Sequence, residues 1–80
     1  MFFVYILYSK SLDRYYTGHT HCIIDRLNRH NSGRSKATKG GIPWEIMHTE
    51  SFKTKSDAYK RERVIKAKKS RKDVEKLIAG

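Results

Sequence analysis

The sequence predicts an α+β fold with its elements in the order β-β-α-β-α-α. Runs rich in β-branched and aromatic residues predict three strands, over residues 2–8, 14–17 and 44–52. Capping residues and helical spacing of apolar side chains predict one helix between the second and third strands and two more after the third.

The first strand, residues 2–8, is apolar on both faces, as expected of a central strand. A polar segment of about five residues leads to the second strand, which Gly18 ends, so the two strands read as a hairpin. The third strand alternates in part. This alternation predicts that one of its sides carries Trp44, Ile46 and His48.

The first helix is predicted over residues 21–31, with Thr20 as N-cap and Asn31-Ser32-Gly33 as the stop. The second is predicted from its cap at Ser56 to about residue 69. Ser70 caps the last helix, whose apolar stripe consists of Val74, Leu77 and Ile78.

The chain of 80 residues is expected to form one domain over residues 1–80. Cys22 is the only cysteine, which is ordinary in a reducing compartment, so we expect a cytoplasmic protein. No apolar run approaches the ~18 residues that span a bilayer. The apolar start lacks a basic flank and a cleavage site, so it reads as a strand rather than a signal peptide.

The net charge of +10 comes from 18 Lys and Arg against 8 Asp and Glu, and it favours a polyanionic partner. Residues 53–80 alone carry eleven basic and four acidic side chains, and the loop over 32–43 has three cations and no acid. Nucleic acid is favoured over a merely solvated charged face. A membrane surface is the weaker alternative, because no basic segment has a wide apolar face.

Five side chains are candidates for a functional role, because a structural role does not fully account for them. Tyr5 and Tyr16 lie on neighbouring strands and are expected on one face of the hairpin. Arg26 and His30 share a face of the first helix with apolar residues, and Glu62 falls in the apolar stripe of the second helix. Each has an ordinary alternative: buried tyrosines are common, one cation can snorkel, and Glu62 can pair with Lys66 four residues later.

Together these five residues suit phosphodiester hydrolysis. A carboxylate can hold a hard cation, a guanidinium forks onto phosphate oxygens, and a phenol can act as base once neighbouring cations depress its pKa. Spacing alone leaves open whether they converge.

At these positions the chain resembles the GIY-YIG nuclease family. Val4-Tyr5-Ile6 and Tyr16-Thr17-Gly18 stand at its two signature tripeptides, with ten residues between the tyrosines. Arg26 follows Gly18 by eight residues and His30 comes four later. Further stretches resemble the small stand-alone bacterial branch (UPF0213-like): His30-Asn31-Ser32-Gly33, Thr38, Pro43-Trp44-Glu45, and Ala58-Tyr59-Lys60-Arg61-Glu62 with Lys66.

The resemblance implies a three-stranded antiparallel sheet flanked by about three helices, and a metal-dependent DNA endonuclease. Carried over by position, Tyr5 and Tyr16 flank the attacking water and one of them is the general base. Arg26 stabilises the phosphorane charge, His30 orients the water or the phosphate, and Glu62 is the one protein ligand of Mg²⁺ (or Mn²⁺).

The chain departs from the family pattern at Val4, where glycine is usual, and at Thr17, where Ile or Val is usual. The asparagine that some members carry after the metal-binding glutamate has no counterpart here. Members with defined targets add a DNA-binding domain. Without one, we expect non-specific or structure-selective, salt-dependent DNA binding, with a protein partner as a possible source of specificity. The residues assigned to nucleic-acid contact are His19, Arg34, Lys36, Lys39, Lys66 and Lys69.

Two other functions compete with the nuclease. One is a non-catalytic nucleic-acid-binding module of the same fold, acting in DNA repair or recombination assemblies. The other is a protein-interaction domain with an incidental basic surface. All five candidate positions keep workable chemistry, which favours the enzyme over a degenerate binder.

Overall fold

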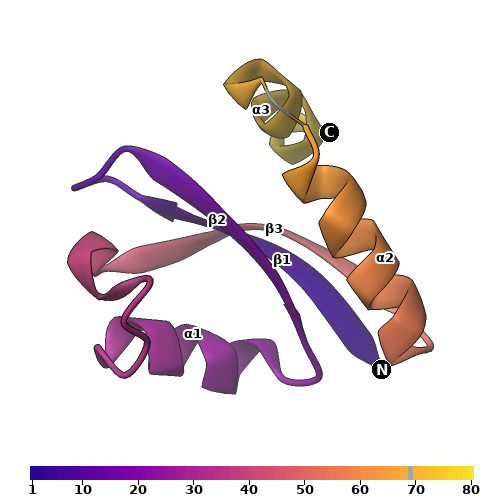
Figure 1. Cartoon of the computed structure of the whole chain (residues 1–80), viewed down its shortest axis with the longest axis horizontal. Coiled ribbons are helices and arrows are strands. Elements are labelled where there is room, and N and C mark those ends of the chain that lie inside the picture. The colour runs from indigo at the N-terminus through magenta and orange to yellow at the C-terminus, as the bar shows by residue number, and fades with distance from the viewer. Residues whose placement is uncertain (69) are drawn as a thin grey trace.

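The computed structural model describes residues 1–68 and 70–80. It has the predicted α+β order (Figure 1). The elements are β1 (Phe2–Ser9), β2 (Arg14–Thr20), α1 (Ile23–Asn31), the short 3₁₀ helix η1 (Lys39–Gly41), β3 (Trp44–Phe52), α2 (Lys55–Lys66) and α3 (Arg71–Ala79). The helices described are all too short and too polar to cross a bilayer.

The sheet is antiparallel with the strand order β2-β1-β3, so β1 is central as predicted. Its side chains from Val4 to Leu7 are buried on both faces. Figure 1 shows α1 on one side of the sheet and α2 with α3 on the other. Tyr5 and Leu7 therefore pack toward α1, and Val4 and Ile6 toward the other two helices. The edge strand β2 lies between these two layers, where both can reach it.

A bulge in β3 overturns one prediction. Ile6 pairs with His48 and Leu7 pairs with Ile46, so Met47 is an extra residue in this strand. Because Ile6 and Leu7 point to opposite faces, His48 lies opposite to Ile46 and Trp44. The prediction that residues 44, 46 and 48 share one side is wrong, since a bulge reverses the alternation.

Several boundaries differ from the predicted ones. β2 continues past Gly18 to Thr20, because residues 18–20 still pair with β1. The Thr20 hydroxyl accepts from the backbone N–H of Cys22 in a tight turn, and α1 starts after Cys22. Gly33, with φ of 79°, follows the helix end as predicted.

The N-cap of α2 is Thr54 rather than Ser56: its hydroxyl accepts from the N–H of Asp57 at 3.1 Å. α2 ends at Lys66, short of the predicted end at residue 69, which lies outside the described residues. Ser70 caps α3 as predicted, accepting from the N–H of Lys72 at 3.2 Å.

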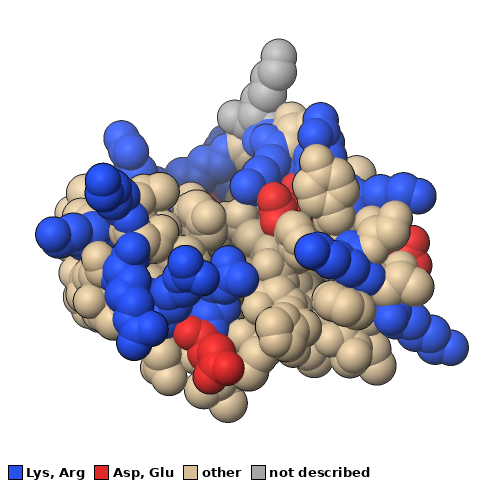
Figure 2. Space-filling view, turned by 60° about the horizontal axis from the view of Figure 1, so that its bottom comes forward, with Lys and Arg blue, Asp and Glu red and all other residues tan. Residues whose placement is uncertain are grey.

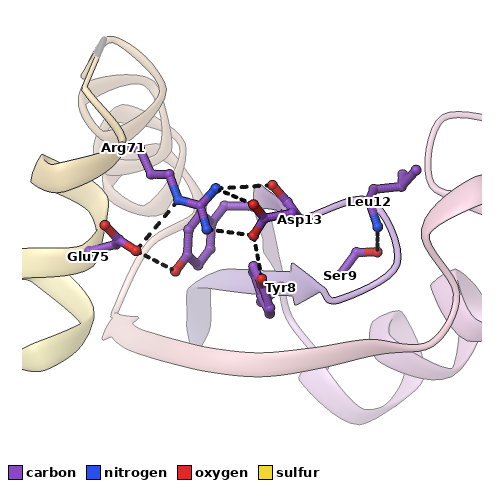
Figure 3. Close-up of polar contacts among 7 residues, drawn as sticks. Tyr8, Ser9, Leu12, Asp13, Arg71 and Glu75 are labelled. Atoms are coloured by element: carbon purple, nitrogen blue, oxygen red, sulfur yellow. Dashed lines mark hydrogen bonds and ion pairs between the residues drawn. The ribbon is translucent and has the colours of Figure 1, made fainter.

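A polar cluster joins α3 to the turn between β1 and β2 (Figure 3). The Arg71 guanidinium binds both carboxylate oxygens of Asp13, at 2.6 and 2.9 Å, and lies 3.5 Å from Glu75. The Tyr8 hydroxyl donates to Asp13 as well. Asp13 has a φ of 52°, a left-handed conformation that Asp and Asn tolerate better than most residues. The turn and the helix, 58 residues apart, thereby hold each other in place.

Candidate active site

The candidate site lies along β2, where side chains from both helical layers meet. Tyr5 on β1 pairs with Gly18 on β2. A β-carbon at position 18 would stand 2.5 Å from the Tyr5 hydroxyl oxygen and 2.7 Å from its Cζ atom. The glycine of the second tripeptide is therefore needed for space, because the buried Tyr5 ring lies directly over it.

Tyr5 belongs to a buried chain of hydrogen bonds. Its hydroxyl lies 3.1 Å from Nε2 of His30, and Nδ1 of His30 lies 2.8 Å from the Thr38 hydroxyl. The three side chains are at most 3 % exposed. The Thr38 hydroxyl donates to the carbonyl of Ser35 at 3.5 Å, so its oxygen is free to accept from Nδ1–H of His30. In this tautomer Nε2 has no proton and can accept the proton of Tyr5.

The loop after α1 holds Thr38 in place. The Trp44 indole N–H donates to the Thr38 carbonyl at 2.7 Å. The Asn31 side chain binds both the N–H and the C=O of Trp44, at 2.7 and 3.1 Å. Thr38 is one of the residues at which the sequence resembles the family, but no role was predicted for it. A lone threonine in a basic loop carries no signal of the histidine it will contact.

Tyr16 reaches the same place from β2. It pairs with Leu7, so it faces α1 as Tyr5 does, and the two phenols project from one face of the hairpin as predicted. Its ring centroid lies 5.0 Å from that of His30 and 6.2 Å from that of Trp44. The Lys66 ammonium stands over the Tyr16 ring, 5.7 Å from its centroid.

Burial dominates the ionisation of Tyr5. The pKa of this phenol is raised to about 12, mainly by burial and also by Tyr16 and Glu62, and Arg26 offsets only part of the shift. The sequence led us to expect a depressed pKa, and the structure reverses that expectation because the ring is buried. Burial also lowers the pKa of His30 below its ordinary 6.5, with help from Arg26 and Arg29. His30 is therefore neutral at pH 7 and able to accept a proton.

Glu62 approaches from α2 and is buried. Its Oε1 accepts from Nδ1–H of His19 at 2.6 Å, and its Oε2 accepts from the Lys66 ammonium at 3.0 Å. Burial raises the pKa of this carboxyl, but these hydrogen bonds and the positive charges outweigh it, and the pKa is lowered overall. Glu62 is thus ionised at neutral pH and paired with Lys66 as expected. Since Lys66 also lies over Tyr16, it connects the two halves of the site.

The donor set fits a hard divalent cation. Glu62 lines an open hollow of about 460 Å³ together with Tyr59, Arg63, Lys66 and Ala67. Among residues 1–68 and 70–80, no three or more His, Cys, Asp or Glu side chains gather into a metal cluster. Mg²⁺ is commonly bound through one or two carboxylates, with water and substrate phosphates as its other ligands. A single ionised carboxylate at the wall of an open hollow meets that requirement, and a bound cation would share the Glu62 oxygens with His19 and Lys66.

The predicted nucleic-acid contacts fall into two groups. His19 and Lys66 lie on Glu62 itself, while Arg34, Lys36 and Lys39 are exposed on the loop after α1. Lys69 lies outside the described residues. Figure 2 shows Lys and Arg side chains on both sides of a surface made mostly of other residues.

The family model described as the GIY-YIG catalytic domain matches residues 1–76. The chain belongs to the GIY-YIG family. Its relatives include a UPF0213 protein of Natronomonas pharaonis, 41 % identical over 96 % of this chain and 89 % of that one, and a UPF0213 protein of Listeria innocua, 38 % identical over 96 % of this chain and 84 % of that one. A solution NMR structure of a UPF0213 protein from Bacillus halodurans aligns with a TM-score of 0.61 and 34 % identity, covering 99 % of this chain and 84 % of that one.

Membership confirms the family resemblance predicted from the two tripeptides. A GIY-YIG domain supports a nuclease-type function with DNA as substrate, and nucleases of this family are generally dependent on divalent metal ions. The structure brings Tyr5 and Tyr16 against His30, Arg26 is close enough to lower the pKa of Tyr5, and Lys66 joins Glu62 to Tyr16.

Proposed function

We propose that this protein is a metal-dependent endonuclease that hydrolyses DNA phosphodiester bonds. The observation that carries the proposal is the buried chain of hydrogen bonds from Thr38 through His30 to Tyr5. It lies near Glu62, which is ionised at neutral pH. A purely structural tyrosine needs a partner for its hydroxyl, but it does not need a neutral histidine whose tautomer is set by a third group.

Tyr5 is the general base in this proposal. A phenol with a pKa near 12 is costly to ionise at neutral pH, so the phenolate is not formed in advance. A water molecule that attacks the phosphorus atom gives its proton to the Tyr5 oxygen while the Tyr5 proton passes to Nε2 of His30. His30 becomes the imidazolium, and the proton is conserved in the step. The choice between the two tyrosines follows from the hydrogen bond, which Tyr5 makes with His30.

The other residues of the site position His30 and the phosphate and stabilise the charge that develops during the reaction. Tyr16 packs edge-on against His30 and limits its rotation. The Arg26 guanidinium is suited to bind non-bridging phosphate oxygens and to stabilise the charge that grows on them. Glu62 would hold a single Mg²⁺ or Mn²⁺. When bound, such an ion polarises the phosphate and stabilises the leaving oxygen.

DNA is held by phosphate contacts in this proposal. Arg34, Lys36 and Lys39 flank one side of the site, and Lys66 lies inside it. Phosphate contacts fix position and carry no sequence information, so binding is non-specific or selective for DNA structure. A separate protein partner is a possible source of further specificity.

Plasmid nicking tests the proposal. The wild-type protein should nick supercoiled DNA with Mg²⁺ and stop on addition of EDTA, and Glu62→Gln should lose at least about 100-fold in rate because the metal carboxylate is gone. Glu45→Gln is the matched control, since Glu45 is exposed on β3 and pairs only loosely with Lys10, at 3.8 Å. It should nick at the wild-type rate.

Undiminished nicking by Glu62→Gln, or nicking in EDTA, would contradict the assigned site. Tight binding of duplex, branched and single-stranded DNA with no turnover on any of them would instead identify the non-catalytic binding module.

A further inference from the structure

Tyr59 occupies a place that the proposed chemistry does not use. It lies on α2, one turn before Glu62, and its side chain is 45 % exposed. The ring separates two hollows. One is the hollow of Glu62, about 460 Å³, and the other, about 530 Å³, is lined by His19, Lys55 and Ser56 together with Tyr59.

The ring is exposed and yet held in position. His19 meets it edge-on with the ring centroids 5.7 Å apart. The Arg63 guanidinium donates to the Tyr59 hydroxyl at 3.0 Å and lies 5.8 Å from the ring centroid. His19 is itself held by the Glu62 carboxylate. The orientation of Tyr59 is therefore coupled to the candidate active site, although its hydroxyl is on the solvent side.

Phosphate binding does not account for this arrangement. Lys55, Arg63 and Lys66 line the two hollows and supply the positive charge that a DNA backbone needs. The Tyr59 hydroxyl can donate to one phosphate oxygen, but this leaves the flat face of the ring unused, and that face can stack on any nucleobase, which is worth about 1–3 kcal/mol per base. Both hollows fall in the size range of small-ligand pockets.

We propose that Tyr59 is a stacking platform for one nucleobase of the DNA strand whose phosphate lies at Glu62, an inference that rests on the proposed function of that site. The base enters one of the two hollows and the adjoining phosphates contact the cations around them. A base inside a duplex has both faces covered by its neighbours. The platform therefore selects DNA in which a nucleotide next to the scissile phosphate is unpaired, as in single strands, frayed ends and branch points.

A binding experiment without cleavage tests this. The probes are a 12-nucleotide single strand carrying one central 2-aminopurine and the duplex of the same sequence, both in EDTA. We expect Tyr59→Leu to weaken single-strand binding by about 5- to 150-fold, the factor that 1–3 kcal/mol represents, and to abolish the quenching of 2-aminopurine on binding. Duplex binding should change by less than about twofold.

Tyr59→Phe is the matched variant, because it keeps the ring and loses only the hydroxyl that Arg63 contacts. It should keep single-strand affinity within a few fold and keep the quenching. Arg34→Gln, on the loop after α1, should weaken single strand and duplex alike. Both Tyr59 variants should fold, since the side chain is exposed and lies outside both apolar clusters.

Equal losses for single strand and duplex in Tyr59→Leu, unchanged single-strand binding, or failure of the wild-type protein to bind either probe would overturn the platform. Nicking that is active and depends on Glu62, combined with a silent Tyr59→Leu, would reject the platform and leave the proposed function standing. Ring-dependent binding without any nicking would reject the proposed function and leave the platform.

Discussion

At the scale of the residue, the candidate site depends on buried polar groups that bind one another. The two nitrogen atoms of His30 face different oxygens, Thr38 on one side and Tyr5 on the other. Thr38 favours a proton on Nδ1, because its hydroxyl can donate to the Ser35 carbonyl, 3.5 Å away, and accept from His30. A residue that never meets the substrate thus determines whether Tyr5 can give up its proton.

Replacing Thr38 by valine tests this positioning role. Valine keeps the shape but leaves Nδ1–H of His30 buried without an acceptor, which costs about 1–3 kcal/mol of unfolding free energy. We expect the nicking rate kcat to fall by about 10-fold or more, with KM little changed, because the imidazole is no longer held toward Tyr5. Thr38→Ser should restore both rate and stability, since it returns the hydroxyl. A serine variant as slow as the valine variant would contradict the role of the hydroxyl.

The pH dependence of cleavage reports on His30. Its pKa is lowered by burial and by Arg26 and Arg29, so the neutral form persists in the folded protein to a pH below 6.5. The proposed proton transfer needs that neutral form. The rate should therefore hold as pH falls to 6.5 and decline only below it, as measured in initial-rate nicking assays at fixed ionic strength. An acid limb that begins above pH 7 would be inconsistent with His30 as proton acceptor.

At the scale of the element, α3 is attached by both an apolar stripe and a polar cluster. Its apolar stripe packs against the core cluster between the sheet and α2, as the spacing of Val74, Leu77 and Ile78 predicted. The contact of Arg71 with Asp13 was not foreseen, because the two residues are 58 positions apart (Figure 3). α3 carries Arg71, Lys72 and Lys76 of the predicted basic C-terminal third, so its attachment decides where these charges are presented.

Acid should loosen the attachment of α3 to the turn between β1 and β2. Hydrogen bonds from Arg71 and Tyr8 lower the pKa of Asp13 from 3.8 to about 2. A carboxyl with a depressed folded-state pKa adds stability above pH 3.8, and that stability is lost as pH falls toward 2. Amide-exchange protection of residues 71–79 should therefore fall over this window.

Asp13→Asn is the control for that measurement. Asparagine tolerates the left-handed backbone of position 13 but cannot carry the charge. In this variant the protection of α3 should be lower at pH 5 and should show no step between pH 4 and 2. An unchanged step would place its origin in another carboxyl.

At the scale of the whole molecule, net charge and surface shape contribute to DNA binding in different ways. The net charge of +10 attracts any polyanion at long range, while the hollows beside Tyr59 and Glu62 decide what is held at short range. The loop of Arg34, Lys36 and Lys39 lies on the α1 side of the sheet, and α3 lies on the other (Figure 1). Charge on these two surfaces should contribute unequally to DNA binding.

Removing charge from the loop tests this. A variant carrying R34Q, K36Q and K39Q should bind duplex DNA more weakly, and its plot of log affinity against log salt should be shallower by up to about 2.7, since each phosphate contact contributes about 0.9. Fluorescence anisotropy between 50 and 300 mM salt measures both. A K72Q/K76Q variant, which loses charge from α3, should change the slope by less than about 0.5. If both variants reduce the salt slope by the same amount for each charge removed, DNA binding is not directed to the α1 side of the sheet.

The fold was predictable wherever local chemistry settles a conformation. The apolar β1, the stop at Gly33 and the cap at Ser70 are as predicted. The bulge at Met47, the extension of β2 to Thr20 and the cap at Thr54 were missed. The position of a bulge and the end of a strand depend on pairing with another strand. Thr54 and Ser56 are both suitable N-cap residues, so the sequence does not distinguish between them.

By itself, the sequence determined the inventory of this protein: the order of elements, the excess of positive charge, and two tyrosines, an arginine, a histidine and a glutamate at family spacing. Only the tertiary structure decided how those residues are connected. Tyr5 meets His30 across 25 positions and His19 meets Glu62 across 43, and neither contact has a local signature. Tertiary burial also raised the pKa of Tyr5 that its neighbouring charges were expected to lower, because removing a phenol from water costs more than one nearby guanidinium returns.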